Sequence, residues 1–401
     1  VDAGSTNGTK LNGVVISLPD RKASEPRTLQ DGDIITIAEE IRLQVALHPA
    51  GVVPSKKRSQ SSESLDKENR SLSVAPRSGC VSLLGVSSSR GATVQNLREP
   101  LLGQPPAPPK AKVLEYHFPG LEADFAIASQ VGSHHWHNDQ GSDDVAYWEV
   151  PFANLEKTGL FGVCDGHFGT KAAQQVQQQL PGALRSALVM GSSSGLLGRK
   201  GCGEALTSAF LEVDARMHME EGATATVLLA ERQADGGVAL QVANVGDSGA
   251  LLIDPDRHGY LVMTADHRVS APAETSRLLD KGTQLTHNNT RMYMLNLARA
   301  MGDSTFKDMD IGLIAEPYVS QLHYFTSFQK AIVVMASDGL WDAVSETEVV
   351  PSVMRMAGRS RVGMRDVAHN LLKAAIERGA SDDVTVCVVR FWPAASASWR
   401  P

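Results

Sequence analysis

The chain has 401 residues, and 42% of them are hydrophobic, which is enough to bury at least one large core. Its formal net charge is −7, so no basic field attracts a phosphate backbone, and we expect no nucleic-acid partner. The cysteines (Cys80, Cys164, Cys202 and Cys387) are scattered without a C-x-x-C pair, a pattern typical of reduced thiols in an intracellular protein rather than of a disulfide framework.

The first 47 residues predict part of an all-β unit. Short β-like runs at residues 13–17 and 33–47 are accompanied by turn signals such as Asn7-Gly8. The chain starts at Val1 rather than Met, within this pattern, so we expect the natural N-terminus to lie upstream. Because no apolar run approaches the roughly 20 residues that span a bilayer, a membrane should be reached only through a partner or through an upstream anchor.

Residues 48–111 predict a disordered linker. They are rich in Ser, Pro, Gly and charge, as in P-S-K-K-R-S-Q-S-S at 54–62, and they show no sustained hydrophobic period. The basic cluster at 56–58 is compatible with a localisation signal, but a solvated charge run in a linker is the more frequent interpretation.

Residues 112–392 combine strands and helices, and residues 393–401 form a short tail. Apolar runs predict strands at 124–129, 145–150, 159–164, 224–230, 238–245, 249–253, 331–336 and 384–391. Amphipathic runs predict helices at 170–188, 204–219, 272–281, 346–356 and 364–378. Because these elements do not follow a strict βαβ order, we predict an α+β fold in which helices pack on sheets.

Acidic residues occur where the apolar strands end. Asp165, Asp247 and Asp338 each follow a predicted strand, while Asp382 and Asp383 directly precede the last one. In an antiparallel sheet the start of one strand lies beside the end of its neighbour, so all these carboxylates can share one edge of a sheet or sandwich. A lone Asp-Gly pair is usually only a turn. Four such positions at the ends of strongly apolar strands favour a common site.

This cluster indicates a metal site. Clustered carboxylates repel one another unless a cation neutralises them, and an oxygen-only set favours Mg²⁺ or Mn²⁺ over Zn²⁺. The carboxylates outnumber those that one Mg²⁺ normally takes, so we expect two or more ions with a bridging hydroxide placed to attack phosphorus. His167 lies two residues beyond Asp165 and is our candidate general acid, because an imidazole titrates at about pH 6.5. The alternative is an ordinary structural or surface histidine.

The ordered motifs resemble those of the metal-dependent, type 2C serine/threonine protein phosphatases. The matching elements are D-G-H-F-G at 165–169, G-A-T-A at 222–225, A-N-V-G-D-S at 243–248, T-A-D-H at 264–267, L-A-R-A-M-G-D at 297–303, A-S-D-G-L-W-D at 336–342 and D-D-V-T-V at 382–386. The resemblance implies a central antiparallel β-sandwich flanked by helices on both faces. It implies that the two main ions are held by Asp165, the carbonyl of Gly166, Asp338 and Asp382. Asp247 would belong to a weaker metal site, and His167 would protonate the departing oxygen.

The sequence departs from the family pattern at its first motif, which pairs a phosphate-binding arginine with an acidic triplet. We interpret residues 138–140 as this triplet, which places Asp139, a further metal ligand, where glutamate is usual. His135 then takes the place of the arginine. Since a histidine cannot present the two parallel donors of a guanidinium, phosphate binding is the step most affected. Phe168 also replaces a glycine of the family's D-G-H-G-G element.

Residues 1–47 resemble the C-terminal part of a forkhead-associated domain, whose Ser-x-Asn-Gly-Thr signature reads S-T-N-G-T at 5–9. The resemblance implies an incomplete all-β fragment with Asn7 as its phosphopeptide contact. The order forkhead-associated domain, linker and phosphatase is similar to that of plant phosphatases that associate with kinases. It implies phosphorylated proteins, including receptor-like kinases, as partners of a monomer. The expected location is the cytoplasm, including the cytoplasmic face of the plasma membrane.

Together these features predict a Mg²⁺- or Mn²⁺-dependent hydrolase of phosphoserine and phosphothreonine in proteins that acts in kinase signalling. One alternative is a catalytically impaired scaffold that binds phosphoproteins, which is motivated by His135 and Gln140. A small-molecule metallohydrolase is a third alternative, because sequence does not report the shape of a pocket.

Overall fold

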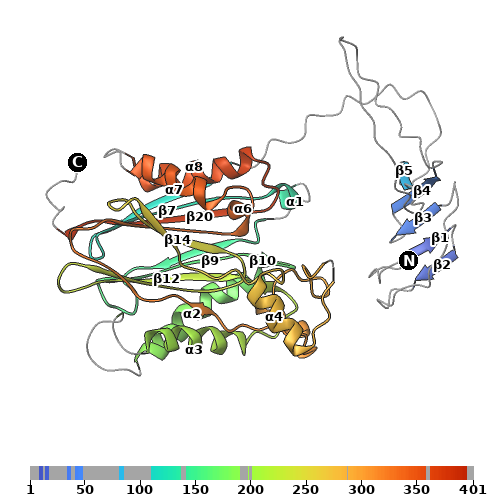
Figure 1. The fold of residues 1–401 in the computed structure, drawn as a ribbon, viewed down its shortest axis with the longest axis horizontal. Helices are drawn as coiled ribbons and strands as arrows, with labels where there is room; N and C mark the ends of the chain where they lie inside the picture. Colours follow the sequence, from blue (N-terminus) through green and yellow to red (C-terminus); the bar gives the residue numbers. More distant parts are fainter. Residues whose placement is uncertain are drawn as a thin grey trace, which may run out of the picture. The chain divides into compact units, whose positions relative to one another are not determined.

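The structure is a computed structural model of the chain. It describes five short strands before residue 85, and residues 110–394 except 137–140, 190–196, 198–200, 287 and 358–361. The chain divides into two compact units, Val1–Gln104 and Pro105–Pro401. Figure 1 labels the elements of both units.

The first unit contains a five-stranded antiparallel sheet with the order β2-β1-β3-β4-β5. Its strands are β1 (Thr9–Leu11), β2 (Val14–Ser17), β3 (Ile34–Ile37), β4 (Ile41–Leu47) and β5 (Val81–Leu84). β2, β3 and β4 lie in the runs that were expected to be β. β5 pairs with β4 and lies inside the predicted linker, where the sequence analysis expected no strand. Asn7 lies outside the described residues.

The second unit is built on two six-stranded antiparallel sheets. The first has the order β17-β13-β12-β9-β8, with β18 also paired to β13. Its strands are β8 (Val145–Glu149), β9 (Thr158–Cys164), β12 (Ala225–Arg232), β13 (Val238–Val245), β17 (Tyr318–Val319) and β18 (His323–Phe325).

The second sheet has the order β15-β14-β19-β20-β7-β6. Its strands are β6 (Lys112–Phe118), β7 (Ala123–Gln130), β14 (Gly249–Asp254), β15 (Gly259–Val262), β19 (Ala331–Ala336) and β20 (Val384–Phe391). A small third sheet joins β10 (Gly166–His167), β11 (Gly222–Ala223) and β16 (Met301–Gly302).

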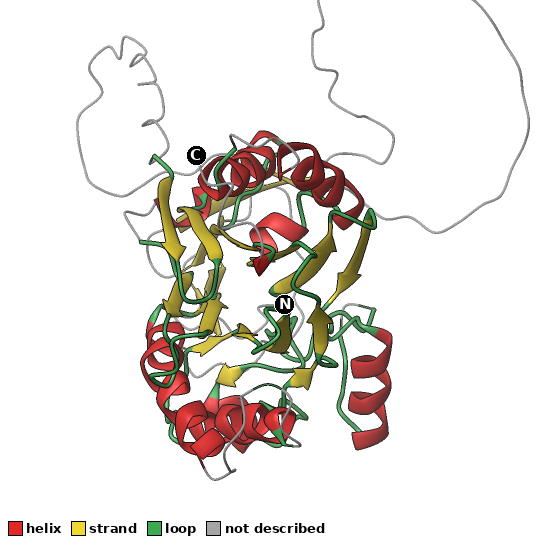
Figure 2. Ribbon diagram, turned by 90° about the vertical axis from the view of Figure 1, so that its left-hand side faces the viewer, coloured by secondary structure: helices red, strands yellow, loops and turns green. Residues whose placement is uncertain are grey.

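Helices cover the outer faces of the two large sheets, as Figure 2 shows. α2 (Lys171–Val189) and α3 (Cys202–Asp214) pack on the first sheet, and α7 (Glu346–Ala357) and α8 (Met364–Glu377) pack on the second. α4 (Pro272–Lys281) lies beside a small separate core. The short helices are α1 (Ser133–Trp136), α5 (Ser304–Asp308) and α6 (Asp338–Trp341). No helix within the described part of the chain is long and apolar enough to cross a membrane.

The core between the two sheets explains why the central strands read as continuous apolar runs. Phe125 of the second sheet and Phe161 of the first are fully buried, with ring centroids 5.0 Å apart. β9, β12, β13, β19 and β20 are buried along their whole length because each has a sheet on one face and a helix layer on the other. The structure thus confirms the predicted α+β sandwich flanked by helices.

Two differences from the sequence prediction in the second unit have identifiable reasons. β6 was not expected, because most of its residues are exposed and its pattern is weak, so its pairing with β7 defines it as a strand. α3 was expected to reach residue 219 but ends at Asp214. The Asp214 carboxylate there accepts hydrogen bonds from the Gly302 N–H and the Lys307 ammonium, so tertiary contacts end the helix early.

Candidate active site

One end of the sandwich gathers the ends of strands from both large sheets. In the first sheet the start of β8 lies beside the end of β9, with Val145 opposite Cys164. In the second sheet the end of β19 lies beside the start of β20, with Ala336 opposite Val386. Residues that follow β9 and β19, or precede β20, therefore converge as the sequence analysis predicted.

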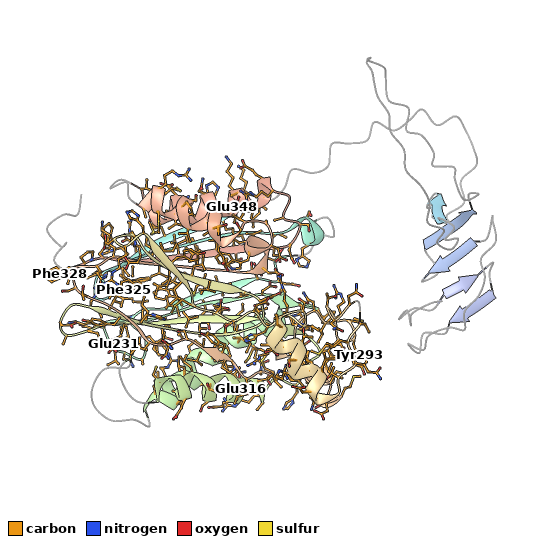
Figure 3. All side chains as sticks on the ribbon, in the orientation of Figure 1. Glu231, Tyr293, Glu316, Phe325, Phe328 and Glu348 are labelled. Carbon is orange, nitrogen blue, oxygen red and sulfur yellow. The ribbon has the colours of Figure 1, made fainter. Side chains whose placement is uncertain are left out.

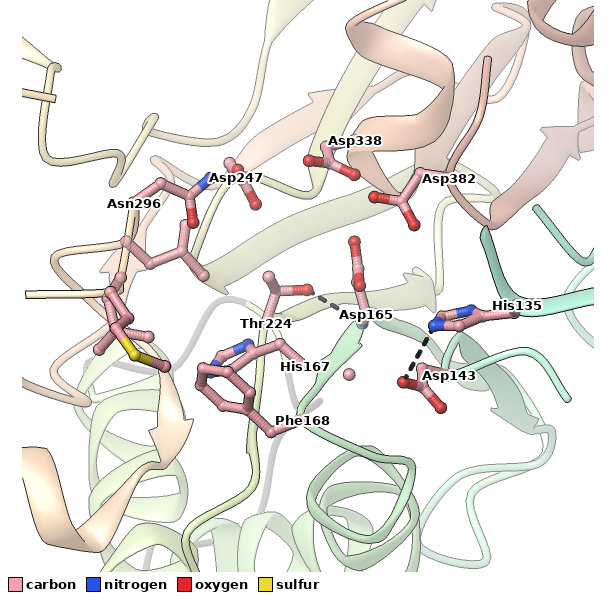
Figure 4. Close-up of a pocket in the computed structure, with 14 residues that line it drawn as sticks. His135, Asp143, Asp165, His167, Phe168, Thr224, Asp247, Asn296, Asp338 and Asp382 are labelled. Carbon is pink, nitrogen blue, oxygen red and sulfur yellow. Dashed lines mark hydrogen bonds and ion pairs between the residues drawn. The ribbon is translucent and has the colours of Figure 1, made fainter. Parts of the chain in front are cut away.

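A cavity of about 320 Å³ lies at this end of the sandwich (Figure 4). The predicted site residues that line it are Asp165, Gly166, His167, Asp247, Asp338 and Asp382, and His135 joins them. The structure thus brings together six of the seven residues proposed for catalysis and metal binding. The seventh, Asp139, lies outside the described residues.

Burial and mutual repulsion raise the pKa values of acids in the cavity. Burial, followed by the charges of Asp144 and Asp338, raises the pKa of Asp165 well above its ordinary value. Burial, followed by the charges of Asp247 and Asp382, raises the pKa of Asp338 to about 8. Oδ1 of Asp338 is buried without a hydrogen-bond partner. These carboxylates therefore have too few compensating donors and would be stabilised by a cation.

Arg268 supplies part of that compensation. Its Nε lies 2.7 Å from Oδ2 of Asp247, and its Nη2 lies 3.3 Å from Asp338 and 2.8 Å from Asp342. Even with this guanidinium beside it, Asp247 has a raised pKa, because burial outweighs the ion pair. One guanidinium is therefore insufficient to neutralise the carboxylates of the cavity.

The donor set fits a divalent cation that prefers oxygen ligands. Asp165, Asp338 and Asp382 line one cavity together with Gly166, whose carbonyl is a further oxygen donor, and burial, repulsion and the unpartnered Asp338 oxygen all favour a cation. Among the described residues, no three histidine, cysteine or acidic side chains converge at the spacing of a formed metal site.

His167 is oriented by a buried carboxylate that the small third sheet brings to it. In that sheet His167 lies opposite Gly222, and Gly222 lies opposite Gly302, which directly precedes Asp303. His167 Nε2 donates to Oδ2 of Asp303 at 2.7 Å, and Asp303 is fully buried. A Cβ atom on Gly222 would overlap both groups, so only glycine allows this pair. Nδ1 of His167 is left as the ring nitrogen for a substrate.

The backbone of Asp165 is held by the threonine of the G-A-T-A element. The Asp165 N–H donates to Oγ1 of Thr224 at 3.0 Å, and the Thr224 N–H donates to the Asp165 carbonyl at 2.8 Å. The hydroxyls of Thr224 and Ser248 are hydrogen-bonded to each other at 2.7 Å, so Ser248 of the G-D-S element helps to hold the Thr224 side chain. Asp165 therefore has a fixed main chain.

His135 lies in the short helix α1, and Asp383 anchors its side chain. Oδ2 of Asp383 accepts a hydrogen bond from His135 Nδ1 at 2.9 Å, and His135 Nε2 lies 3.6 Å from Asp143. Burial alone would lower the pKa of His135, but the hydrogen bond and charge of Asp383, with the charge of Asp143, outweigh it and raise the pKa. His135 therefore keeps more positive charge in the cavity than an isolated histidine.

The sequence analysis missed three acids at this site. Asp143 lines the cavity, and the partly buried Asp144 accepts a hydrogen bond from Ser337 Oγ at 2.7 Å, while desolvation raises its pKa to about 7. Both directly precede β8, so the argument from strand starts that located Asp382 would have found them. Asp303 ends the L-A-R-A-M-G-D element, but only the folded chain shows that it contacts His167.

Phe168 departs from the usual glycine and adopts a backbone conformation that suits glycine. Its φ is +61°, a left-handed conformation that costs roughly 1–2 kcal/mol for a residue with a side chain. Its ring is 54% exposed at the cavity, edge-on to the His167 ring at 5.4 Å. The Phe168 side chain is therefore not buried deeply enough to offset the strain of its backbone.

Known proteins resemble the second unit. The chain is 34% identical over 256 residues to Protein phosphatase 2C 70 of Arabidopsis thaliana, which covers 62% of this chain and 44% of that protein. It is 29% identical over 290 residues to Protein phosphatase 1L of Bos taurus, which covers 68% and 76%. The chain spans less than half the length of the first curated relatives that it matches.

A solved phosphatase from Toxoplasma gondii shares the fold. Its TM-score is 0.58 at 19% identity, and the match covers 71% of this chain and 96% of the other. The sequence profile of the Protein phosphatase 2C family matches residues 129–384, a range that contains the cavity residues from His135 to Asp382. The chain therefore belongs to the protein phosphatase 2C family.

Proposed function

We propose that this chain is a Mg²⁺- or Mn²⁺-dependent phosphatase that hydrolyses phosphoserine and phosphothreonine in proteins. The observation that carries the proposal is the cavity in which Asp165, Asp338 and Asp382 meet a histidine oriented by a buried carboxylate. The family is metal-dependent, and the two relatives described above are protein phosphatases by name. Two or more ions are the arrangement that best matches the number of carboxylates.

The residues of the chain have separate tasks in this proposal. Asp165, Asp338, Asp382 and the Gly166 carbonyl would hold the ions, with Asp143 beside them. Ions bound there would neutralise the carboxylates and lower the pKa of water. Thr224 fixes the main chain of Asp165, so this carboxylate would keep its place while substrate enters.

His167 would deliver the proton that the serine or threonine oxygen needs as it leaves. An alkoxide is a poor leaving group, so a positioned acid is expected to contribute about 10²-fold to 10⁴-fold to the rate. Asp303 accepts from Nε2 and so holds the ring with Nδ1 toward substrate. His135, held by Asp383, would supply positive charge to the phosphate in place of the family's arginine.

The test is turnover of a phosphothreonine peptide by the full chain as Mn²⁺ is titrated. Asp338→Asn should abolish turnover and reduce the rise in melting temperature that Mn²⁺ produces. Asp310→Asn is the matched control, because Asp310 is 85% exposed and its carboxylate pairs with Lys281 at the surface. A wild-type protein that stays inert at every Mn²⁺ concentration would contradict the proposal.

A catalytically impaired scaffold that binds phosphoproteins is the second candidate. It is favoured by His135, which stands where the family has arginine and is bound to Asp383 rather than free to grip a phosphate with two donors. His135→Arg separates the two candidates. A large gain in turnover would show an impaired site, whereas no gain in an already active enzyme would exclude the scaffold.

We further propose phosphorylated proteins, including receptor-like kinases, as partners of a monomer in the cytoplasm or at the cytoplasmic face of the plasma membrane. The order of a forkhead-associated fragment, a linker and a phosphatase, inferred from the sequence, supports this, as do the buried free thiols of Cys164 and Cys387. Capture of kinases by the Asp338→Asn chain, light scattering and imaging of a fluorescent fusion test these points. A secreted or stably oligomeric protein would contradict them.

A further inference from the structure

Two exposed apolar side chains stand beside the acidic cavity. Phe168 is 54% exposed and Met294 is 64% exposed, yet both line the cavity that Asp165 and Asp338 also line. Figure 4 shows Phe168 next to His167 at its edge. Large apolar groups exposed beside a polar site commonly mark a contact for a ligand.

The local structure defines the backbone at both residues, although their side chains are largely exposed. Phe168 keeps a positive φ of 61° that glycine would adopt without strain. Met294 lies in a turn that Met292 and Leu295 close with two reciprocal backbone hydrogen bonds of 3.0 Å. Arg291 Nη1 also donates to the Met294 carbonyl at 2.8 Å. These two apolar groups at the cavity are called the rim, defined as Phe168 and Met294.

The rim lies within reach of residues next to a phosphorylated one. The Phe168 ring is 5.4 Å from the imidazole of His167, which must approach the departing oxygen. Neighbouring Cα atoms are about 3.8 Å apart, so a side chain one or two residues from the phosphorylated residue can reach the ring. A polar or charged neighbour gains little from an apolar rim, because it would lose contact with water there.

We propose that the Phe168–Met294 rim selects phosphopeptides that carry a bulky aliphatic side chain within two residues of the phosphorylated serine or threonine. The proposal rests on the phosphatase function proposed above and adds a preference to it. The occupant of the rim is thus a leucine-like side chain of the substrate, while the phosphate enters the acidic cavity.

The experiment compares two phosphothreonine peptides that differ only in having leucine or serine on both sides of the phosphorylated residue. The full chain in Mn²⁺ should show a higher kcat/KM for the leucine peptide. Phe168→Gly and Met294→Ser should each lower the ratio of the two values by about three- to tenfold, the size expected when one aromatic or thioether contact is lost. The melting temperature of Phe168→Gly should stay at or above that of the wild type, because backbone strain is released.

Phe328→Ser is the matched control. Phe328 is 78% exposed and does not line the cavity, and Figure 3 places it at the opposite end of the unit from Tyr293. Its variant should keep the wild-type ratio. A wild-type ratio near unity, or a ratio that Phe168→Gly and Met294→Ser leave unchanged, would overturn the proposal.

A second readout separates this proposal from the proposed function. If the wild type hydrolyses neither peptide nor p-nitrophenyl phosphate, the phosphatase function fails, and calorimetry with non-hydrolysable phosphonate versions of both peptides tests the rim alone. Tighter binding of the leucine peptide that Phe168→Gly removes supports the rim. Equal binding of both peptides refutes it.

Discussion

Replacing Gly222 with alanine should break the pair between His167 and Asp303 without removing either group. The new Cβ would overlap Oδ2 of Asp303 and Nε2 of His167. To reach ordinary contact, the two atoms must retreat by roughly 1 Å, which carries their 2.7 Å hydrogen bond beyond its working range. Because Asp303 is fully buried, it cannot exchange His167 for water.

The magnitude follows from that lost hydrogen bond. A hydrogen bond to a charged group contributes about 1.5–3 kcal/mol, so the free energy of unfolding of Gly222→Ala should fall by about that amount. Loss of an oriented general acid should lower kcat for a phosphoserine peptide by about 10²-fold or more. Turnover of p-nitrophenyl phosphate should change far less, since nitrophenolate leaves without a proton.

The assay is the ratio of the two activities, together with urea unfolding. Gly182→Ala in α2 is the control, because a Cβ there meets only Nη2 of Arg185 at 4.0 Å. That change should raise the free energy of unfolding by about 0.5–1 kcal/mol and leave the ratio unchanged. If Gly222→Ala keeps the wild-type ratio, His167 does not need Asp303 and the reasoning is refuted.

Three further predictions concern His267, Thr224 and Arg268. His267 is buried and its pKa is lowered to about 4, chiefly by burial and then by Arg299, so it stays neutral in the folded chain while the unfolded chain protonates. Stability should therefore fall by about 2 kcal/mol between pH 7 and pH 5, and His267→Gln should flatten this fall in urea unfolding; an unchanged slope would contradict it. Thr224→Val leaves the Asp165 N–H without an acceptor and should lower the free energy of unfolding by about 1–3 kcal/mol, whereas Thr224→Ser should not. Arg268→Gln should lower the melting temperature in EDTA and enlarge the rise produced by Mn²⁺, because a cation then replaces the guanidinium beside Asp247; equal rises in variant and wild type would speak against this.

The sandwich and the acidic end were predictable because both depend on local pattern. Apolar runs marked the central strands, and β13, β19 and β20 begin and end where the pattern placed them. The position of Asp165, Asp247 and Asp338 after such strands was enough to predict their convergence, because antiparallel pairing forces strand ends together.

The rest depends on contacts between distant segments. Asp303 contacts His167 only because β16 pairs with β11 and β11 with β10, in strands of two residues that have no pattern of their own. The raised pKa of His135 depends on Asp383, which lies 248 residues away in the sequence. The position of Asp143 and Asp144 before β8 was a usable signal. It was missed because the family's acidic triplet was assigned to residues 138–140.

The carboxylate of Asp383 has a consequence for how the cavity tolerates change. Its Oδ1 accepts the Gly132 N–H at 2.7 Å and its Oδ2 accepts the Asp143 N–H at 2.6 Å. The carboxylate of Asp383 thus holds the backbone at both Gly132 and Asp143. A change of length between residues 136 and 142 should therefore leave Asp143 in place, because the Asp383 carboxylate fixes the backbone on both sides of that segment.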